Sequence, residues 1–143
     1  MAKYVNIFRS SYFRVKDEDK WKDLWENHVD GEDLEDFSYK DDDGNRWHGF
    51  GGSGTYGYFN SRDALEYGDE MLDLDDFLDK IAELIIQGDA CVIYDVGYEK
   101  VRYISGSTIV VTTGEVQFSN LADVSHNMMR AVGVDPKTVR EEY

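Results

Sequence analysis

The chain has 143 residues, and its 30 Asp and Glu against 15 Lys and Arg give a formal net charge of −15 at pH 7. Hydrophobic residues make up 41% of the chain and aromatic residues 14%. This content excludes a disordered acidic tail, because such tails lack the side chains that build a core. The length suits one domain, and Cys91, as the only cysteine, excludes an internal disulfide.

The acidic residues are concentrated in one part of the chain. Residues 17–89 hold 23 acids and 6 bases, a net charge of −17, whereas residues 1–16 and 90–143 together hold 7 acids and 9 bases, a net charge of +2. We therefore expect one domain over residues 1–143, with an acidic segment at 17–89 and a near-neutral scaffold at 90–143. Concentrated like charge repels itself and lowers the stability of a compact state, which favours a role in binding a basic partner. The alternative is that the acids only form a solvated surface.

Strand and helix patterns alternate in the first third of the chain. Residues 4–15 are rich in β-forming side chains and predict a strand that is interrupted at Ser10-Ser11. Asp17 is a suitable N-cap for a helix that ends near residues 27–29. One face of this helix is marked by side chains at helical spacing, namely Trp21, Leu24, Trp25 and His28.

A meander of antiparallel strands is expected next. Alternating residues around Phe37 and Tyr39 predict one strand, and the turn residues 41–45 separate it from a second strand at 46–50. A glycine-rich bend then leads to a third strand at 55–59.

The second half of the chain begins with its clearest helix, over residues 74–85. Asp73 or Asp75 is the expected cap and Gly88 the expected stop, and the apolar face consists of Leu74, Phe77, Leu78, Ile81, Leu84 and Ile85. Four strands follow, at 90–96, 100–104, 108–113 and 116–118, separated by turns at 97, 105–107 and 114–115. A last helix starts at Leu121 and stops at Gly133.

The expected order of elements is β-α-β-β-β-α-β-β-β-β-α. Runs of strands joined by short turns, with about three helices, indicate a single α+β domain with antiparallel β meanders.

Three short patterns resemble cofactor or metal sites but lack the context that such sites need. Residues 49–54 match G-x-G-x-x-G, yet a strand pattern follows where a dinucleotide site requires a helix. Residues 41–45 match the start of a calcium loop, but the required Gly and Glu positions hold Arg46 and Gly52. The three histidines lack zinc-ligand spacing; they are His28, His48 and His126. We predict no cofactor and no metal site.

No catalytic residue can be named from the sequence. A nucleophile elbow of the G-x-S-x-G type is missing, and carboxylates are too numerous for an acid–base pair to stand out. An arrangement that is assembled only in space, such as Ser-His-Asp, stays open. We predict a protein that is not an enzyme, with an unrecognised enzyme as the remaining alternative.

The candidate partner-binding residues are acids of the segments 30–43 and 63–79. Acids four residues apart on a helix, such as Asp75 and Asp79, lie about 5–6 Å apart, and B-DNA presents one phosphate charge per ~1.7 Å of its axis. Rows of carboxylates can therefore imitate a duplex and compete for a groove lined by Lys and Arg. The candidates are Asp30, Glu32, Asp33, Glu35, Asp36, Asp41, Asp42, Asp43, Asp63, Glu66, Asp69, Glu70, Asp73, Asp75, Asp76 and Asp79.

Two stretches, Ser11–Glu18 (SYFRVKDE) and Val96–Ile104 (VGYEKVRYI), resemble small acidic proteins carried by phages and conjugative elements of Firmicutes. The similarity extends from the first strand to the last helix. The acidic profile is similar to that of DNA-mimic anti-restriction and anti-CRISPR inhibitors. The resemblance implies an inhibitor of host defence, but it transfers no binding residue, because the matching stretches are structural in character.

We therefore expect a non-enzymatic inhibitor that occupies the nucleic-acid channel of a host defence complex, a CRISPR effector first and a restriction enzyme second. Its partner would be a basic nucleic-acid-binding protein or nuclease complex, without direct binding of nucleic acid or membrane. The alternative is an acidic adaptor that binds a basic partner through the aromatic, glycine-rich surface around residues 47–59. Because no apolar stretch is long enough for a membrane span, we expect the cytoplasm of a bacterial host.

Overall fold

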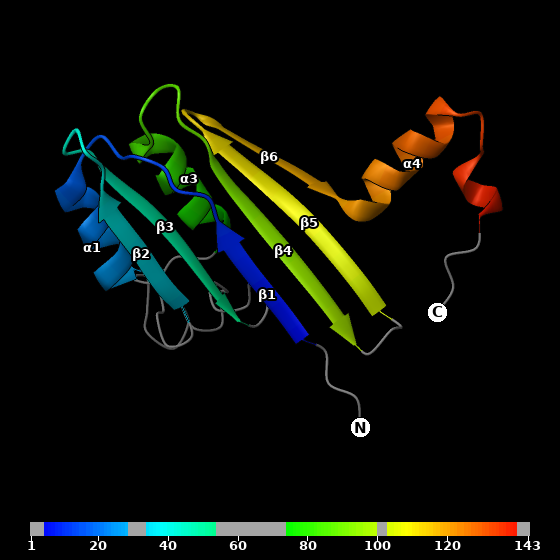
Figure 1. The fold of residues 1–143 in the computed structure, drawn as a ribbon, viewed down its shortest axis with the longest axis horizontal. Helices are drawn as coiled ribbons and strands as arrows, with labels where there is room; N and C mark the ends of the chain where they lie inside the picture. Colours follow the sequence, from blue (N-terminus) through cyan, green and yellow to red (C-terminus); the bar gives the residue numbers. More distant parts are fainter. Residues whose placement is uncertain (1–4, 29–33, 54–73, 100–102, 140–143) are drawn as a thin grey trace.

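The computed structural model describes residues 5–28, 34–53, 74–99 and 103–139. Within these ranges the chain forms one six-stranded antiparallel sheet with helices on one of its faces (Figure 1). The strand order across the sheet is β2-β3-β1-β4-β5-β6. The strands are β1 (Val5–Ser10), β2 (Leu34–Lys40), β3 (Arg46–Ser53), β4 (Cys91–Glu99), β5 (Tyr103–Thr112) and β6 (Glu115–Asn120).

Two of the described helices cover the sheet and a third stands away from it (Figure 1). The covering helices are α1 (Glu18–His28) and α3 (Leu74–Leu84), and the third is α4 (Leu121–Ala131), which follows β6 directly. A short 3-10 helix at Pro136–Thr138 comes after α4.

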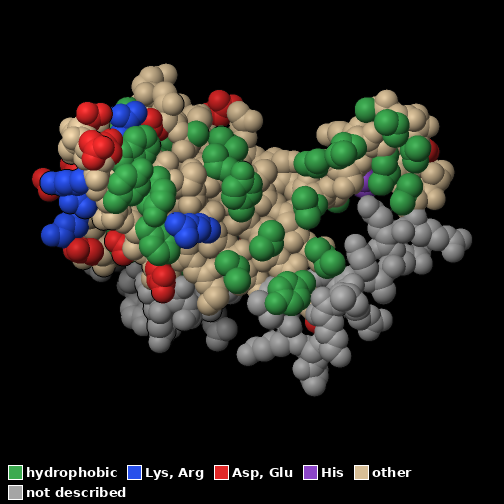
Figure 2. Space-filling view, in the orientation of Figure 1, with side chains coloured by type: hydrophobic (Ala, Val, Ile, Leu, Met, Phe, Trp, Pro, Cys, Tyr) green, Lys and Arg blue, Asp and Glu red, His purple; other side chains and the backbone are tan. Residues whose placement is uncertain are grey.

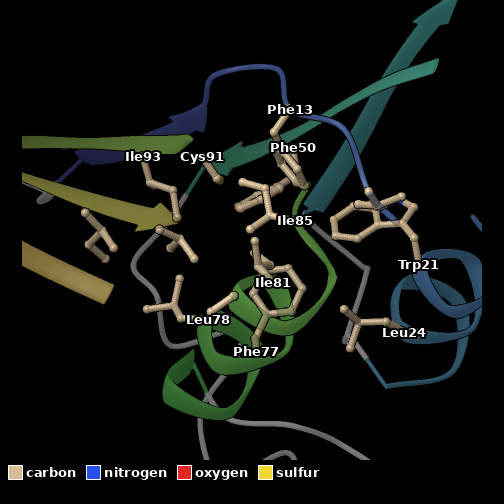
Figure 3. Packing of buried hydrophobic residues seen from close by; sticks show 14 of the residues in the cluster. Phe13, Trp21, Leu24, Phe50, Phe77, Leu78, Ile81, Ile85, Cys91 and Ile93 are labelled. Carbon is tan, nitrogen blue, oxygen red and sulfur yellow. The ribbon is translucent and has the colours of Figure 1, made fainter. Parts of the chain in front are cut away.

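The core lies between one face of the sheet and the helices α1 and α3. The ring of Phe77 from α3 meets Trp21 of α1 and Phe50 of β3, with centroid distances of 6.5 and 5.3 Å. Figure 3 shows the aliphatic side chains of α3 and the strands continuing this layer, with Ile81 and Ile93 both within 1% of full burial. Large apolar side chains packed this closely supply most of the free energy that holds such a domain together.

The α+β fold class and the predicted order of strands and helices are confirmed. The first strand ends at Ser10, as expected, and the chain then makes isolated bridges at Phe13, which pairs with His48, and at Val15, which pairs with Ile85. The expected strand at 55–59 lies outside the described residues.

The C-terminal strands differ from expectation in number and in boundaries: where four were expected, the described residues form β4, β5 and β6, and β5 runs through the turn expected between the strands at 100–104 and 108–113. Residues 105–107 form no turn, because they lie inside β5 and pair with β4 throughout. Packing explains the glycine at position 106, because a Cβ on Gly106 would come within 2.7 Å of the Leu121 side chain. Gly97 likewise lies within β4, opposite Asn6 of β1 and Ser105 of β5. A glycine inside a strand can mark close approach of a neighbouring group as well as a turn.

Candidate interaction surfaces

The face of the sheet opposite α1 and α3, here called the outer face, is apolar and exposed at its centre. Strand pairing places Ile7 opposite Val96, and Tyr98 opposite Ile104. These four side chains and Tyr94 are between 50% and 63% exposed. We call these five residues the apolar centre; Figure 2 shows hydrophobic side chains gathered over this part of the sheet. Contiguous exposed apolar surface marks a site of interaction more often than scattered single residues do.

Aromatic side chains continue the outer face toward β2 and β3. Tyr39 stacks on Trp47 at 6.4 Å and meets the edge of Tyr12 at 5.0 Å. The guanidinium of Arg14 lies 4.7 Å from the Trp47 ring, and that of Arg9 lies 4.7 Å from the ring of Phe37. Cations over aromatic faces add electrostatic attraction to packing. We call Tyr12, Phe37, Tyr39 and Trp47 the aromatic end.

A shallow pocket of about 420 Å³ opens beside the aromatic end. Its lining includes Arg9, Glu35, Phe37 and Gly51. Gly51 contributes to the hollow because a Cβ at this position would lie 2.9 Å from the carbonyl oxygen of Phe8. A side chain is therefore excluded at this position of β3, and the surface stays concave.

The acidic residues avoid the outer face of the four central strands. Among the described positions whose side chains point to that face from β1, β3, β4 and β5, none is Asp or Glu. Arg9 is the charged residue there. Most of the described acids lie instead on α1 and α3, on the β2–β3 turn and on the strand β2 at the edge of the sheet. The described structure thus separates an acidic side from an apolar one.

The structure describes eight of the sixteen predicted partner-binding acids. Glu35 and Asp36 lie on β2 and point to opposite faces, and both are exposed. The acids of α3 are exposed on the side of the helix that faces away from the core; they are Asp75, Asp76 and Asp79. Asp41, Asp42 and Asp43 form the β2–β3 turn. The other eight lie outside the described residues: Asp30, Glu32, Asp33, Asp63, Glu66, Asp69, Glu70 and Asp73.

Asp41 has a structural role in the turn. Its carboxylate accepts hydrogen bonds from the Trp47 indole at 2.9 Å and from the backbone N–H groups of Asp43 and Asn45 at 3.0 and 2.9 Å. These bonds, the one from Trp47 above all, lower the pKa of Asp41. The D-x-D-x-N pattern therefore closes a hairpin here and places the aromatic end. No group of three or more His, Cys, Asp or Glu in the described ranges is arranged to hold a metal ion.

One described pocket has the polar groups that acid–base chemistry would use. Its volume is about 400 Å³, and its lining includes His48 and Glu18, whose Nε2 and Oε2 atoms lie 2.7 Å apart. Ser38, also in the lining, accepts a hydrogen bond from Arg46 at 3.2 Å. His48 lies on β3 and Glu18 in the first turn of α1, so the pair ties this helix to the sheet. We assign the pair that structural role.

The Arg14–Asp89 pair fixes the loop after α3 to the segment after β1. Asp89 accepts three hydrogen bonds from Arg14, from the backbone N–H and from the guanidinium Nε at 2.9 Å each, and from the second guanidinium nitrogen at 2.7 Å. The guanidinium hydrogen bonds hold the pKa of Asp89 below its usual value. Sequence reasoning missed this pair, because its members are 75 positions apart and neither belongs to a recognisable pattern.

Comparisons with protein-family models, with curated proteins and with solved structures found no match. In the described part of the chain, no helix is both long and apolar enough to span a membrane. We therefore infer the function from residue chemistry and geometry.

Proposed function

We propose that the protein is a non-enzymatic inhibitor that binds a basic nucleic-acid-binding protein of a host defence system and blocks its nucleic-acid channel. A CRISPR effector is the first candidate target and a restriction enzyme the second. The observation that carries the proposal is the separation of charge. Exposed carboxylates gather on α1, α3 and the β2–β3 turn, while the outer face of the central strands has none among its described positions.

The acids of α3 suit the proposed mimicry. Asp75 and Asp79, and then Asp79 and Glu83, are spaced by one helical turn, so their carboxylates form a row with steps of about 5–6 Å. Lys80 lies beside this row and pairs with Glu83 at 3.5 Å. Because α3 holds four acids and this one base, it keeps an excess of negative charge. A positively charged channel that holds a nucleic-acid duplex would attract such a row by the same long-range field.

The proposal predicts binding that depends on both salt and α3. The immobilised chain should capture nucleic-acid-binding proteins from a bacterial lysate at low salt and release them as the salt rises, because screening weakens surface charge pairs. We expect the double variant Asp75→Lys with Asp79→Lys to weaken binding to a purified, guide-loaded Cas9-type effector by at least about tenfold, the equivalent of about 1.4 kcal/mol.

The matched control reverses two exposed acids outside the acidic segment, Glu115→Lys with Asp123→Lys. It changes the net charge by the same amount, so it should leave affinity near that of the unchanged protein if the position of the charge matters. Circular dichroism checks that each variant is folded. Captured partners that stay bound at high salt, or equal losses in both double variants, would contradict a duplex mimic.

A second candidate function, an acidic adaptor, is favoured by the aromatic end and the pocket beside it. Of the surface expected at residues 47–59, residues 54–59 lie outside the described residues, and Trp47 belongs to the aromatic end. Tyr and Trp are enriched among residues that dominate binding energy, and Tyr39 is 45% exposed although it stacks on Trp47. In an adaptor the acids would set the rate of encounter and the aromatic end the lifetime of the complex. Tyr39→Ala would then raise the dissociation rate of a captured partner, whereas the α3 double variant would mainly slow association.

A further inference from the structure

Two of the apolar surfaces exposed in the described structure come, apart from Ile7, from residues 90–143. The first is the apolar centre of the outer face. The second is one face of α4, where side chains at helical spacing are between 45% and 77% exposed. We call it the α4 stripe; it consists of Leu121, Val124, Met128 and, just after the helix, Val132. An amphipathic helix normally buries such a stripe against another element.

The direct connection between β6 and α4 brings only the start of the stripe, Leu121, onto the chain's own sheet. Asn120 is both the last residue of β6 and the N-cap of α4, where its side chain accepts a hydrogen bond from the Asp123 backbone at 2.8 Å. No linker therefore separates strand and helix. Leu121 lies against Gly106 of the outer face, and from this corner α4 leads away from the sheet (Figure 1).

We propose that the protein forms a symmetric homodimer in which the α4 stripe of each copy packs on the apolar centre of the other. Figure 2 shows hydrophobic side chains of α4 and of the sheet on the same side of the molecule. In a two-fold dimer, the α4 stripe of the first copy can therefore meet the apolar centre of the second, and the same contact occurs again with the copies exchanged. With roughly 200 Å² for a fully exposed large side chain, the nine side chains expose on the order of 1,000 Å² per copy. A standard interface uses about 800 Å² per partner.

The distribution of charge permits this pairing in spite of the net charge of −15. The described outer-face positions of β1, β3, β4 and β5 include no acid, and the charges of α4, Asp123 and Arg130, balance. The acidic helices α1 and α3 lie on the far side of each sheet, away from the proposed interface. Salt should therefore strengthen the dimer, because it screens the remaining repulsion between two copies.

This response to salt is opposite to that of the proposed inhibitor function, on which the dimer does not depend. Binding of a basic partner by the acidic side weakens as salt rises, whereas self-association through the apolar surfaces strengthens. Failure of one proposal can therefore be told from failure of the other.

The first test measures the mass of the chain in solution by sedimentation equilibrium, over protein concentrations from about 1 to 200 µM. We expect twice the chain mass of 16.5 kDa. Because each change would bury a carboxylate in an apolar interface, Met128→Glu and Tyr94→Glu should each raise the dissociation constant at least about tenfold. Gln87→Glu, at an exposed turn residue outside both surfaces, adds the same charge and should change nothing. A monomer at every concentration, or an equal effect of Gln87→Glu, overturns the proposal.

The second test identifies which surfaces meet. Cys91 is fully buried, and burial raises the pKa of its thiol to about 12, so an introduced cysteine is the reactive one among described residues. Copies with Met128→Cys and copies with Tyr94→Cys, distinguished by a tag, should form a mixed disulfide under mild oxidation. The matched mixture of Met128→Cys with Gln87→Cys should not. Equal cross-linking in the two mixtures, or a dimer that gives no mixed disulfide, overturns the arrangement.

Discussion

At the scale of single residues, the hydrogen bonds of a carboxylate determine whether it stabilises the fold or stays exposed on the surface. Asp89 accepts three hydrogen bonds from Arg14, and Asp41 holds the Trp47 indole and two backbone N–H groups. Both carboxyl groups have a lowered pKa. These two acids stabilise the fold, whereas exposed acids such as Asp75 and Asp79 are available to a partner. The net charge alone does not separate the two kinds.

The Arg14–Asp89 pair predicts a loss of stability in acid. Because the folded-state pKa of Asp89 is lowered, the carboxylate contributes stability above its ordinary pKa of about 3.9. This contribution is lost as the pH falls through the lower folded-state value. We expect Asp89→Asn to lower the free energy of unfolding at pH 7 and to flatten its decrease below about pH 4, as measured by urea unfolding at several pH values. Asp42→Asn, at an exposed turn position, is the control. Parallel curves for the two variants would contradict the role of the pair.

At the scale of elements, α3 has a buried apolar side and an exposed acidic side. Its buried side packs Phe77, Leu78, Ile81 and Ala82 into the core, and its exposed side carries the row of acids. The like charges one turn apart each cost a few tenths of a kcal/mol, which the buried side offsets many times over. The helix can therefore carry an unfavourable charge row because its position is fixed by packing.

The buried side of α3 predicts a large effect of truncation. Phe77 is fully buried between the rings of Trp21, Trp25 and Phe50, so Phe77→Ala leaves a cavity and should lower the free energy of unfolding by about 3–5 kcal/mol. Lys22→Ala, exposed on α1, should change it by less than about 0.5 kcal/mol. Chemical denaturation measures both. A loss below about 1 kcal/mol for Phe77→Ala would mean that the core is packed differently.

At the scale of the whole molecule, the charge separation gives the protein two surfaces with opposite physical character. The acidic side is held on a layer of helices, and the apolar side is the sheet face with α4 beside it. The acidic side can interact with other molecules over a long range through its charge. The apolar side can interact only at short range, through packing. The near-neutral segment, which we expected to act as a scaffold, thus also carries an exposed apolar surface.

The net charge predicts that salt stabilises the folded chain. At low ionic strength, the field of −15 charges opposes the compact state. Raising NaCl from about 10 mM to 1 M shortens the screening length from about 30 to 3 Å. Since several like-charge neighbours each cost a few tenths of a kcal/mol, we expect the free energy of unfolding to rise on the order of 1 kcal/mol. Urea unfolding at each salt concentration checks this. A decrease with NaCl would show that favourable charge pairs dominate instead.

The sequence by itself determined the helices α1, α3 and α4 and the strands β1 to β3, because their signals are local. Apolar residues at helical spacing predicted α3 within a residue of its end, and Asp17 with the face of Trp21 and Leu24 predicted α1. The α+β class followed from the order of these elements. The sequence also showed that the negative charge is concentrated in residues 17–89, because the charges can be counted from the residue types alone.

Only the tertiary structure decided which face of the sheet is covered. Apolar side chains occupy both faces of β4, since Cys91 and Ile93 are buried while Tyr94 and Val96 are exposed, and alternation alone cannot say which set meets the helices. The same holds for Gly106, which reads as a turn in the sequence and is a packing position under Leu121 in the fold. The physical reason is that burial depends on partners distant in the chain, and strand pairing and helix placement select those partners.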